Sequence, residues 1–150
     1  MIKLLRTNSK NKDFLELITH LDAELKIRDG DNHDFYDQFN KLDNIKNVVV
    51  AYENESPIGC GAFKIYQNST IEIKRMYVSL LGRRKGVATK VLNELENWAK
   101  ELNFTKCILE TGIQQPEAIE LYKKCGYTIT PNFGFYENAE NSVCFEKIIK

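Results

Sequence analysis

The fold of this chain is decided by the stretch Ile71-Glu-Ile-Lys-Arg-Met-Tyr-Val-Ser-Leu-Leu-Gly-Arg-Arg-Lys-Gly-Val-Ala-Thr-Lys-Val-Leu92. Its first part, from Ile71 to Val78, is rich in apolar and β-branched residues, which favour an extended strand. Gly82 and Gly86 then mark positions where the backbone turns tightly. The stretch therefore predicts a strand, a basic turn and the start of a helix, one directly after the other.

The predicted helix carries an apolar face and begins beside a cluster of cations. Its apolar residues recur every three or four positions, as in a helix that packs on a sheet: Val87, Val91, Leu92, Leu95, Trp98, Ala99 and Leu102. Arg83, Arg84 and Lys85 stand just before it. The first N–H groups of a helix have no intrahelical acceptor and lie at the positive end of its dipole. The turn therefore predicts a phosphate-binding site.

Two motifs in this half of the chain identify a family. Neither G-x-x-x-x-G-K-S/T nor G-x-G-x-x-G occurs, so the two commonest nucleotide motifs are excluded. The turn contains Arg83-x-x-Gly86-x-Ala88 instead, and Glu117-Ala-Ile-Glu-Leu-Tyr-Lys-Lys-Cys-Gly-Tyr127 follows downstream. The first resembles the acetyl-CoA motif Q/R-x-x-G-x-G/A of the GNAT superfamily of N-acetyltransferases, and the second resembles that family's A-x-x-L-Y-x-x-x-G-F/Y unit. Two motifs in the family's order are more specific than either alone.

Composition limits the kinds of protein that this chain can be. Its 150 residues fit a single domain spanning 1–150, and 43% hydrophobic with 28% charged residues is ordinary for a soluble globular protein. A formal net charge of zero gives no sign of a nucleic-acid partner. No apolar run is long enough to span a bilayer, and the N-terminus lacks the apolar region of a signal peptide. We therefore expect a cytoplasmic protein with neither a nucleic-acid nor a membrane partner.

The cysteines and histidines predict neither a disulfide nor a metal site. The cysteines form no C-x-x-C pair and lie in or beside apolar segments, as buried free thiols do: Cys60, Cys107, Cys125 and Cys144. His20 and His33 lie in separate segments without supporting ligands.

The hydrophobic pattern predicts an α/β (α+β) fold with a mixed, mostly antiparallel sheet of about six to seven strands and about four helices. The expected strands are residues 2–5, 47–52, 58–66, 71–78, 106–110, 127–130 and 143–149. The expected helices are residues 12–25, a short one near 35–39, 87–102 and 116–124. A strand–helix–strand crossover makes the fourth and fifth strands parallel neighbours. Gly59 and Gly61 predict a bulge or a close backbone approach in the third strand.

Two polar stretches leave two interpretations each. Residues 28–34 and the aromatic residues Phe35, Tyr36 and Phe39 form either an acidic, aromatic-lined mouth for a cationic substrate or a solvated connection. Residues 131–141 form a turn-rich loop whose aromatic side chains either wall a substrate pocket or pack within a hairpin.

The resemblance implies how acetyl-CoA would bind. In the family, the fourth and fifth strands splay apart, and the pantetheine arm lies between them, paired with the main chain of the fourth strand. Carried over to this sequence, the main-chain contacts fall on Met76, Tyr77 and Val78, and the pyrophosphate falls on Arg83, Arg84, Lys85, Gly86, Val87, Ala88 and Thr89. Family members often have an asparagine after the fifth strand, and here Gln114 or Gln115 takes its place.

The resemblance also implies catalytic roles for two residues. Tyr122 occupies the family's tyrosine position, where the phenol protonates the departing thiolate of CoA; the alternative is a tyrosine half buried against the sheet. Glu72 stands where some members carry the glutamate that deprotonates the amine. The alternatives for Glu72 are a surface pairing with Lys74 or binding of the substrate's ammonium. Strict alternation would place Glu72, Lys74 and Met76 on one face of the strand.

The sequence therefore predicts an N-acetyltransferase that moves an acetyl group from acetyl-CoA directly to a primary amine. A regulatory protein that binds acetyl-CoA without turning it over, or a general nucleotide-binding domain, is the competing interpretation. Peptide α-amines, lysine side chains, polyamines, small amino acids and drugs all remain candidate acceptors, and a homodimer is one assembly that the sequence allows. Arg75 and Arg28 point to a carboxylate in the acceptor.

Overall fold

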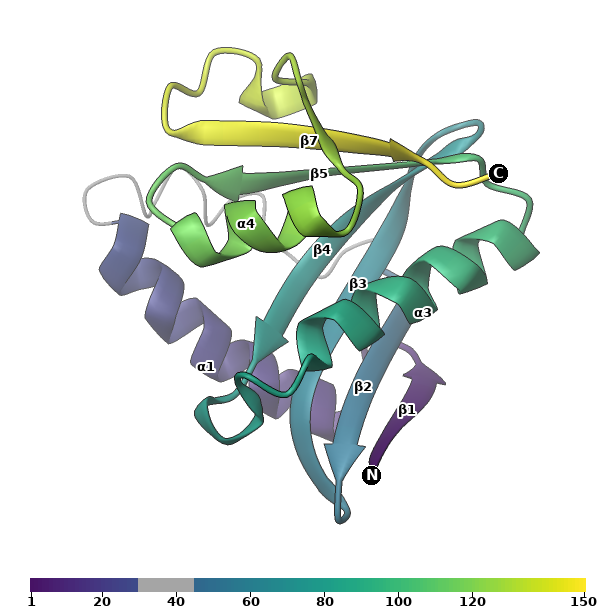
Figure 1. Ribbon diagram of the computed structural model, residues 1–150, viewed down its shortest axis with the longest axis vertical. Coiled ribbons are helices and arrows are strands. Elements are labelled where there is room, and N and C mark those ends of the chain that lie inside the picture. Colours follow the sequence, from purple (N-terminus) through teal and green to yellow (C-terminus); the bar gives the residue numbers. More distant parts are fainter. Residues whose placement is uncertain (30–44) are drawn as a thin grey trace.

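The computed structural model describes residues 1–29 and 45–150 and builds them around one mixed sheet. The strands are β1 (Ile2–Thr7), β2 (Asn47–Glu53), β3 (Ser56–Gln67), β4 (Thr70–Val78), β5 (Lys106–Gly112), β6 (Thr128–Thr130) and β7 (Ser142–Ile148). They pair in the order β1-β2-β3-β4-β5-β7-β6 (Figure 1). Every neighbouring pair is antiparallel except β4 and β5, which are parallel. The predicted sheet is confirmed.

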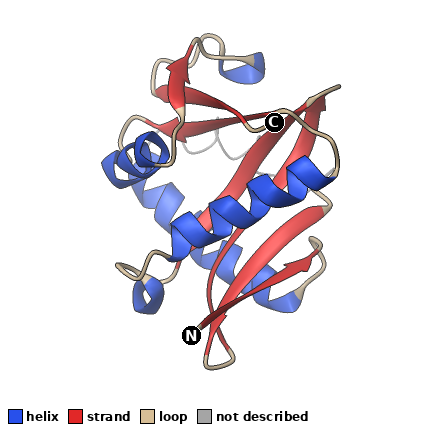
Figure 2. Cartoon of the chain, turned by 45° about the vertical axis from the view of Figure 1, so that its right-hand side comes forward, coloured by secondary structure: helices blue, strands red, loops and turns tan. Residues whose placement is uncertain are grey.

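Helices cover both faces of the sheet (Figure 2). Helix α1 (Lys12–Asp29) packs Phe14, Leu17 and Ile18 on one face. Helices α3 (Val87–Glu101) and α4 (Pro116–Lys124) pack on the other, and two short 3-10 turns, η2 (Leu80–Gly82) and η3 (Gly134–Tyr136), connect elements. The described residues thus contain three α-helices. The helix expected near 35–39 and the proposed substrate mouth lie outside the described residues, apart from the end of α1.

Strands β4 and β5 are paired over only a short distance. Thr70, Ile71 and Glu72 lie opposite residues 106–108, and no later residue of β4 pairs with β5. Strand β5 continues to pair with β7 as far as Gly112, while β4 runs on to Val78. Figure 1 shows the two strands separating beyond their common end. The splayed parallel pair implied by the family resemblance is therefore confirmed.

A β-bulge in β4 corrects the predicted alternation of side chains. The register with β3 shifts between Cys60 and Ala62, where β4 carries one residue more than its partner. The bulge includes Arg75, whose φ of 59° lies in the left-handed region. Beyond it, Met76 packs in the core under α3, whereas Tyr77 packs on the α1 side. The prediction that Met76 shares a face with Glu72 is wrong, because strict alternation does not survive an inserted residue.

A side-chain cap begins α1, and the close backbone approach predicted for β3 is confirmed. Asn11 caps α1, since its side-chain oxygen accepts a hydrogen bond from the Phe14 N–H at 2.9 Å. A Cβ at Gly61 would lie only 2.9 Å from Val91 and 3.0 Å from Leu95, so β3 and α3 do approach closely there.

All four cysteines are free, and the described residues include no cluster that could hold a metal ion. No helix within 1–29 or 45–150 is long and apolar enough to cross a membrane.

Candidate active site

A groove of about 330 Å³ lies where β4 ends and α3 begins. It is bordered by α1, the last residues of β4, the turn before α3 and the first turns of α4. Many of the residues predicted to bind the cofactor line it: Met76, Tyr77, Val78, Arg83, Arg84, Gly86, Val87, Ala88, Thr89 and Gln115. We call it the long groove.

The start of α3 offers main-chain donors to this groove. Gly86 is the N-cap residue with φ 74°, a left-handed conformation that glycine adopts without steric cost. The Lys90 N–H donates to the Gly86 carbonyl at 3.1 Å, so the N–H groups of Val87, Ala88 and Thr89 precede the first bond of the helix. A Cβ on Gly86 would touch nothing within 4 Å. The helix start is therefore open toward the groove, as a site for a phosphate group requires.

The basic triplet before α3 is divided among three environments. The Arg83 guanidinium donates to the Val78 carbonyl at 3.0 Å and to Glu24 of α1 at 2.7 Å. The Lys85 amine instead donates to Glu53 at 2.7 Å, at the end of β2, and does not line the groove. Arg84 lines it and has a left-handed φ of 67°.

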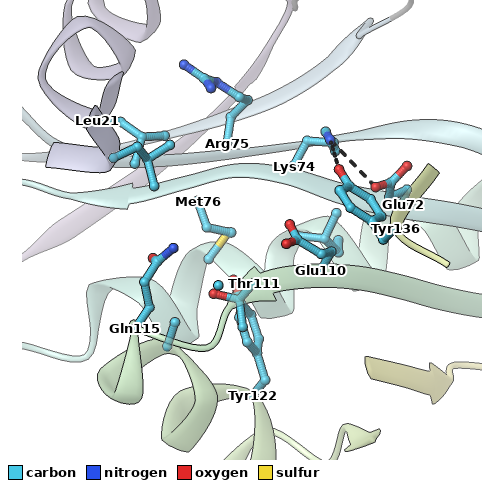
Figure 3. A pocket seen from close by; sticks show the side chains of 14 residues that line it. Leu21, Glu72, Lys74, Arg75, Met76, Glu110, Thr111, Gln115, Tyr122 and Tyr136 are labelled. Atoms are coloured by element: carbon cyan, nitrogen blue, oxygen red, sulfur yellow. Dashed lines mark hydrogen bonds and ion pairs between the residues drawn. The ribbon is translucent and has the colours of Figure 1, made fainter. Parts of the chain in front are cut away.

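A smaller inner cavity of about 110 Å³ continues from the long groove into the space between the splayed strands (Figure 3). The two share lining residues from α1, β4 and α4: Leu21, Leu25, Met76, Gln115 and Ala118. Gln115 therefore lies where they join, whereas Gln114 is exposed and lines neither. Of the two glutamines considered for the family's asparagine position, only Gln115 faces the site.

Glu72 and Lys74 form a buried ion pair in the inner cavity. They are only 4% and 8% exposed, and the Lys74 amine lies 3.6 Å from one Glu72 oxygen. The same amine donates to the hydroxyl of Tyr136 at 3.2 Å, as Figure 3 shows. The amine of Lys64 lies 3.9 Å from the other Glu72 oxygen. Burial lowers the pKa of Lys74, an effect that Glu72 opposes. The ion pair between Glu72 and Lys74, one of the alternatives considered for Glu72, was expected at the surface but is buried.

Tyr122 lines the same cavity from α4, with its ring beside Thr111 in Figure 3. It is 6% exposed and packs against Tyr127 and Phe145, with ring centroids 5.8 and 5.9 Å away. Burial, and to a smaller extent the carboxylate of Glu110, raises the pKa of Tyr122. The phenol therefore keeps its proton throughout the neutral pH range.

Several residues of the inner cavity were not predicted as site residues. Glu110 lies near the end of β5 and accepts a hydrogen bond from the Ser142 hydroxyl at 2.7 Å. Tyr136 belongs to the loop 131–141, and its ring lines the cavity, as one of the two interpretations of that loop predicted. The ring of Phe133, in the same loop, packs instead on Tyr66, with 5.4 Å between the ring centroids. The position of Glu110 after a buried run was the one available signal, because ligands bind beyond the carboxyl ends of parallel strands.

Comparison with known proteins agrees with this geometry. The model of the acetyltransferase (GNAT) family matches residues 14–127. The Xenopus tropicalis protein "Probable N-acetyltransferase 14" is 40% identical over 83 residues, which cover 55% of this chain and 40% of that protein, so the chain spans less than half of this relative's length.

Solved structures match over nearly the whole chain. A Klebsiella pneumoniae protein assigned to the acyl-CoA N-acyltransferases superposes with a TM-score of 0.84 at 27% identity, covering 100% of this chain and 99% of that one. The PaiA N-acetyltransferase of Thermoplasma acidophilum, solved with coenzyme A, has the same fold, with a TM-score of 0.73 at 17% identity and 99% coverage of both chains. From the family model and the shared fold together, we conclude that this chain belongs to the acetyltransferase (GNAT) family.

Proposed function

We propose that the protein is an acetyl-CoA-dependent N-acetyltransferase that acts on a primary amine. The observation that carries this proposal is the continuity of the two cavities, which share Met76 and Gln115. A phosphate-binding helix start opens at one end, and Glu72 and Tyr122 line the other. An acyl transfer needs both ends in one channel, because the donor must be held and protons must move at the reacting atoms.

The residues of the long groove fit CoA. The main-chain donors of Val87, Ala88 and Thr89 suit a pyrophosphate, and Arg84 adds a positive charge at the same place. The edge of β4 from Ile73 to Val78 is not paired with β5, so its main chain is available to an extended arm. The structural neighbour from Thermoplasma acidophilum was solved with coenzyme A, which supports this assignment.

When bound, acetyl-CoA supplies the acetyl thioester. Glu72 takes a proton from the acceptor amine, whose nitrogen bonds to the acetyl carbon as the carbon–sulfur bond breaks. The departing sulfur takes its proton from the phenol of Tyr122, which burial keeps protonated. Lys74 and Lys64 lie 3.6 and 3.9 Å from the Glu72 carboxylate and hold it in place.

Ligand binding tests the donor site. Acetyl-CoA should raise the melting temperature of the protein, and ATP at the same concentration should not. Gly86→Asp should abolish most of the shift, because it places a negative charge against the pyrophosphate. Gly86→Asn is the matched control, since asparagine has the same shape, tolerates a left-handed φ and carries no charge. Equal shifts with both ligands, or equal binding by both variants, would contradict the proposed site.

The competing function is an acetyl-CoA-binding regulator. Thiol release from acetyl-CoA in the presence of an amine panel separates the two, since a regulator binds without turnover. The proposal keeps the cytoplasmic location expected from the sequence. Size-exclusion chromatography tests the homodimer.

A further inference from the structure

Arg75 is a charged residue of the inner cavity. Among the described residues that line this cavity, it alone has buried side-chain N–H groups without a hydrogen-bond acceptor. It is 6% exposed, and its side chain is 2% exposed. The Nη2 atom donates a hydrogen bond to the carboxylate of Asp22, on α1, at 2.7 Å. Within the described residues, Nε and Nη1 are buried without a hydrogen-bond partner. In Figure 3 the guanidinium projects from β4 toward the side of α1 and Leu21, and it points away from the group formed by Lys74, Tyr136 and Glu72.

Two energetic costs meet at this residue. A buried donor without an acceptor is destabilising, and the cost is larger when the group is charged. The backbone of Arg75 also has a φ of 59°, which few residues other than glycine adopt. Costs of this kind accumulate at functional sites, where the surrounding structure holds the strained residue in place. An anionic ligand group would supply the missing acceptors.

The bulge determines which charges line the cavity. In a regular strand Lys74 and Arg75 would point to opposite faces. Here Lys74 lies opposite Ala62 of the core under α1, and Arg75 donates to Asp22 of α1, so both lie on the α1 side, and both residues line the inner cavity. The amine of Lys74 is already shared between Glu72 and Tyr136. The cavity therefore combines a carboxylate that can receive an amine, at Glu72, with a guanidinium that retains free donors, at Arg75. This combination is complementary to a zwitterion.

We propose that the acceptor is a small amine that also carries a carboxylate, as a free amino acid does. Arg75 binds the carboxylate, for which a guanidinium offers several N–H donors in a planar fork, and the amine lies toward Glu72. This substrate class rests on the proposed acetyltransferase activity. Polyamines and other amines without an acid group lack a partner for Arg75 and are poor acceptors.

Matched acceptors test the proposal. Each standard amino acid that has a primary α-amine, which excludes proline, is compared with its own carboxamide in the thiol-release assay. The best amino acid should have a kcat/KM about ten- to a hundredfold above that of its amide, the range expected for a hydrogen-bonded charge. Equal use of acid and amide, or a preference for the amide, overturns the carboxylate site. Turnover of those amines would still support the acetyltransferase, whereas no turnover with any amine contradicts the acetyltransferase itself.

A pair of variants separates binding from architecture. Arg75→Gln should raise the KM for the amino acid about ten- to a hundredfold and leave the KM for the amide unchanged. Asp22→Asn breaks the same ion pair but keeps the guanidinium, so it should retain the preference for the acid. If both variants lose that preference equally, Arg75 only anchors α1 and the proposal is wrong. Should Arg75→Gln fail to fold, the acid-to-amide ratio of the Asp22→Asn variant still decides.

Discussion

Tyr122 is held in a packed environment that keeps its phenol protonated. Tyr122→Phe keeps the ring contacts with Tyr127 and Phe145 and removes only the hydroxyl. We expect kcat to fall about ten- to a thousandfold, the contribution typical of a general acid, while the KM for acetyl-CoA hardly changes. Steady-state thiol release measures both. Full kcat in this variant, with chemistry rate-limiting, would make Tyr122 a packing residue.

Glu72 allows two roles that kinetics can separate. If it is the base, Glu72→Gln should lower kcat near neutral pH, and activity should recover as free amine accumulates at high pH. If it only holds the acceptor's ammonium, the acceptor KM rises and kcat stays near wild type. Glu110→Gln is the matched control, since Glu110 is another carboxylate of the inner cavity. Equal kcat losses in both variants would contradict a specific role for Glu72.

Sequence could identify these residues but not their surroundings. Tyr122 and Glu72 became candidates through the family resemblance, and both line the inner cavity. The Glu72–Lys74 pair was considered as a surface contact, but it is buried because the loop that carries Tyr136 covers it. That cover depends on contacts between residues more than sixty positions apart, as in the bond from Lys74 to Tyr136. Local patterns carry no information about such contacts.

At the scale of elements, the glycines of β3 decide how closely α3 can pack. Gly61→Ala would place a methyl group against the sulfur of Met76, its nearest neighbour, and 2.9 Å from Val91 and 3.0 Å from Leu95 of α3. We expect a loss of about 1–3 kcal/mol in the free energy of unfolding, the usual cost of overpacking a core, measured by urea denaturation. Combining it with Val91→Ala should restore part of the room, while Met76 and Leu95 stay close, so the two losses should be less than additive. Strict additivity would mean that the two side chains do not compete for space.

The strands and helices could be predicted from the spacing of apolar residues, but the bulge in β4 could not. The strands, the helix after Gly86 and the order of the sheet agree with the predictions because apolar spacing determines which faces are buried. The bulge at Arg75 was missed. The residues Lys74 to Val78 carry no glycine or proline that would mark it, and it became visible only in the register with β3. That one inserted residue changed which side chains face the inner cavity.

At the scale of the whole molecule, a buried polar network joins the two arms of the splayed sheet. Glu96 of α3 accepts hydrogen bonds from the Tyr127 hydroxyl at 2.8 Å and from the Lys147 amine of β7 at 2.9 Å. Helix α3 packs on β2, β3 and β4, whereas β7 pairs with β5. The network therefore ties together the strands that diverge around the inner cavity, and its loss should weaken the whole domain.

The pH dependence of stability tests this network. Burial raises the pKa of Tyr127 above 10.0, its ordinary value, and the carboxylate of Glu96 adds to the effect. Below about pH 10 the phenol is protonated in both folded and unfolded chains, so its contribution to stability is complete. Above that pH the unfolded chain releases this proton while the folded protein retains it. The contribution should then fall by as much as about 1.4 kcal/mol per pH unit.

Tyr127→Phe should therefore be most harmful at neutral pH. It removes a hydrogen bond to a buried carboxylate, which typically costs about 1.5–3 kcal/mol in the free energy of unfolding. The difference from wild type should narrow as the pH rises above about 10, because only the wild type loses the contribution of the phenol. Urea denaturation at pH 7, 9, 10 and 11 measures this difference. A difference that stays constant to pH 11 would show that the folded state does not hold the Tyr127 proton, and the link between the two arms would then rest on Lys147 and Glu96 alone.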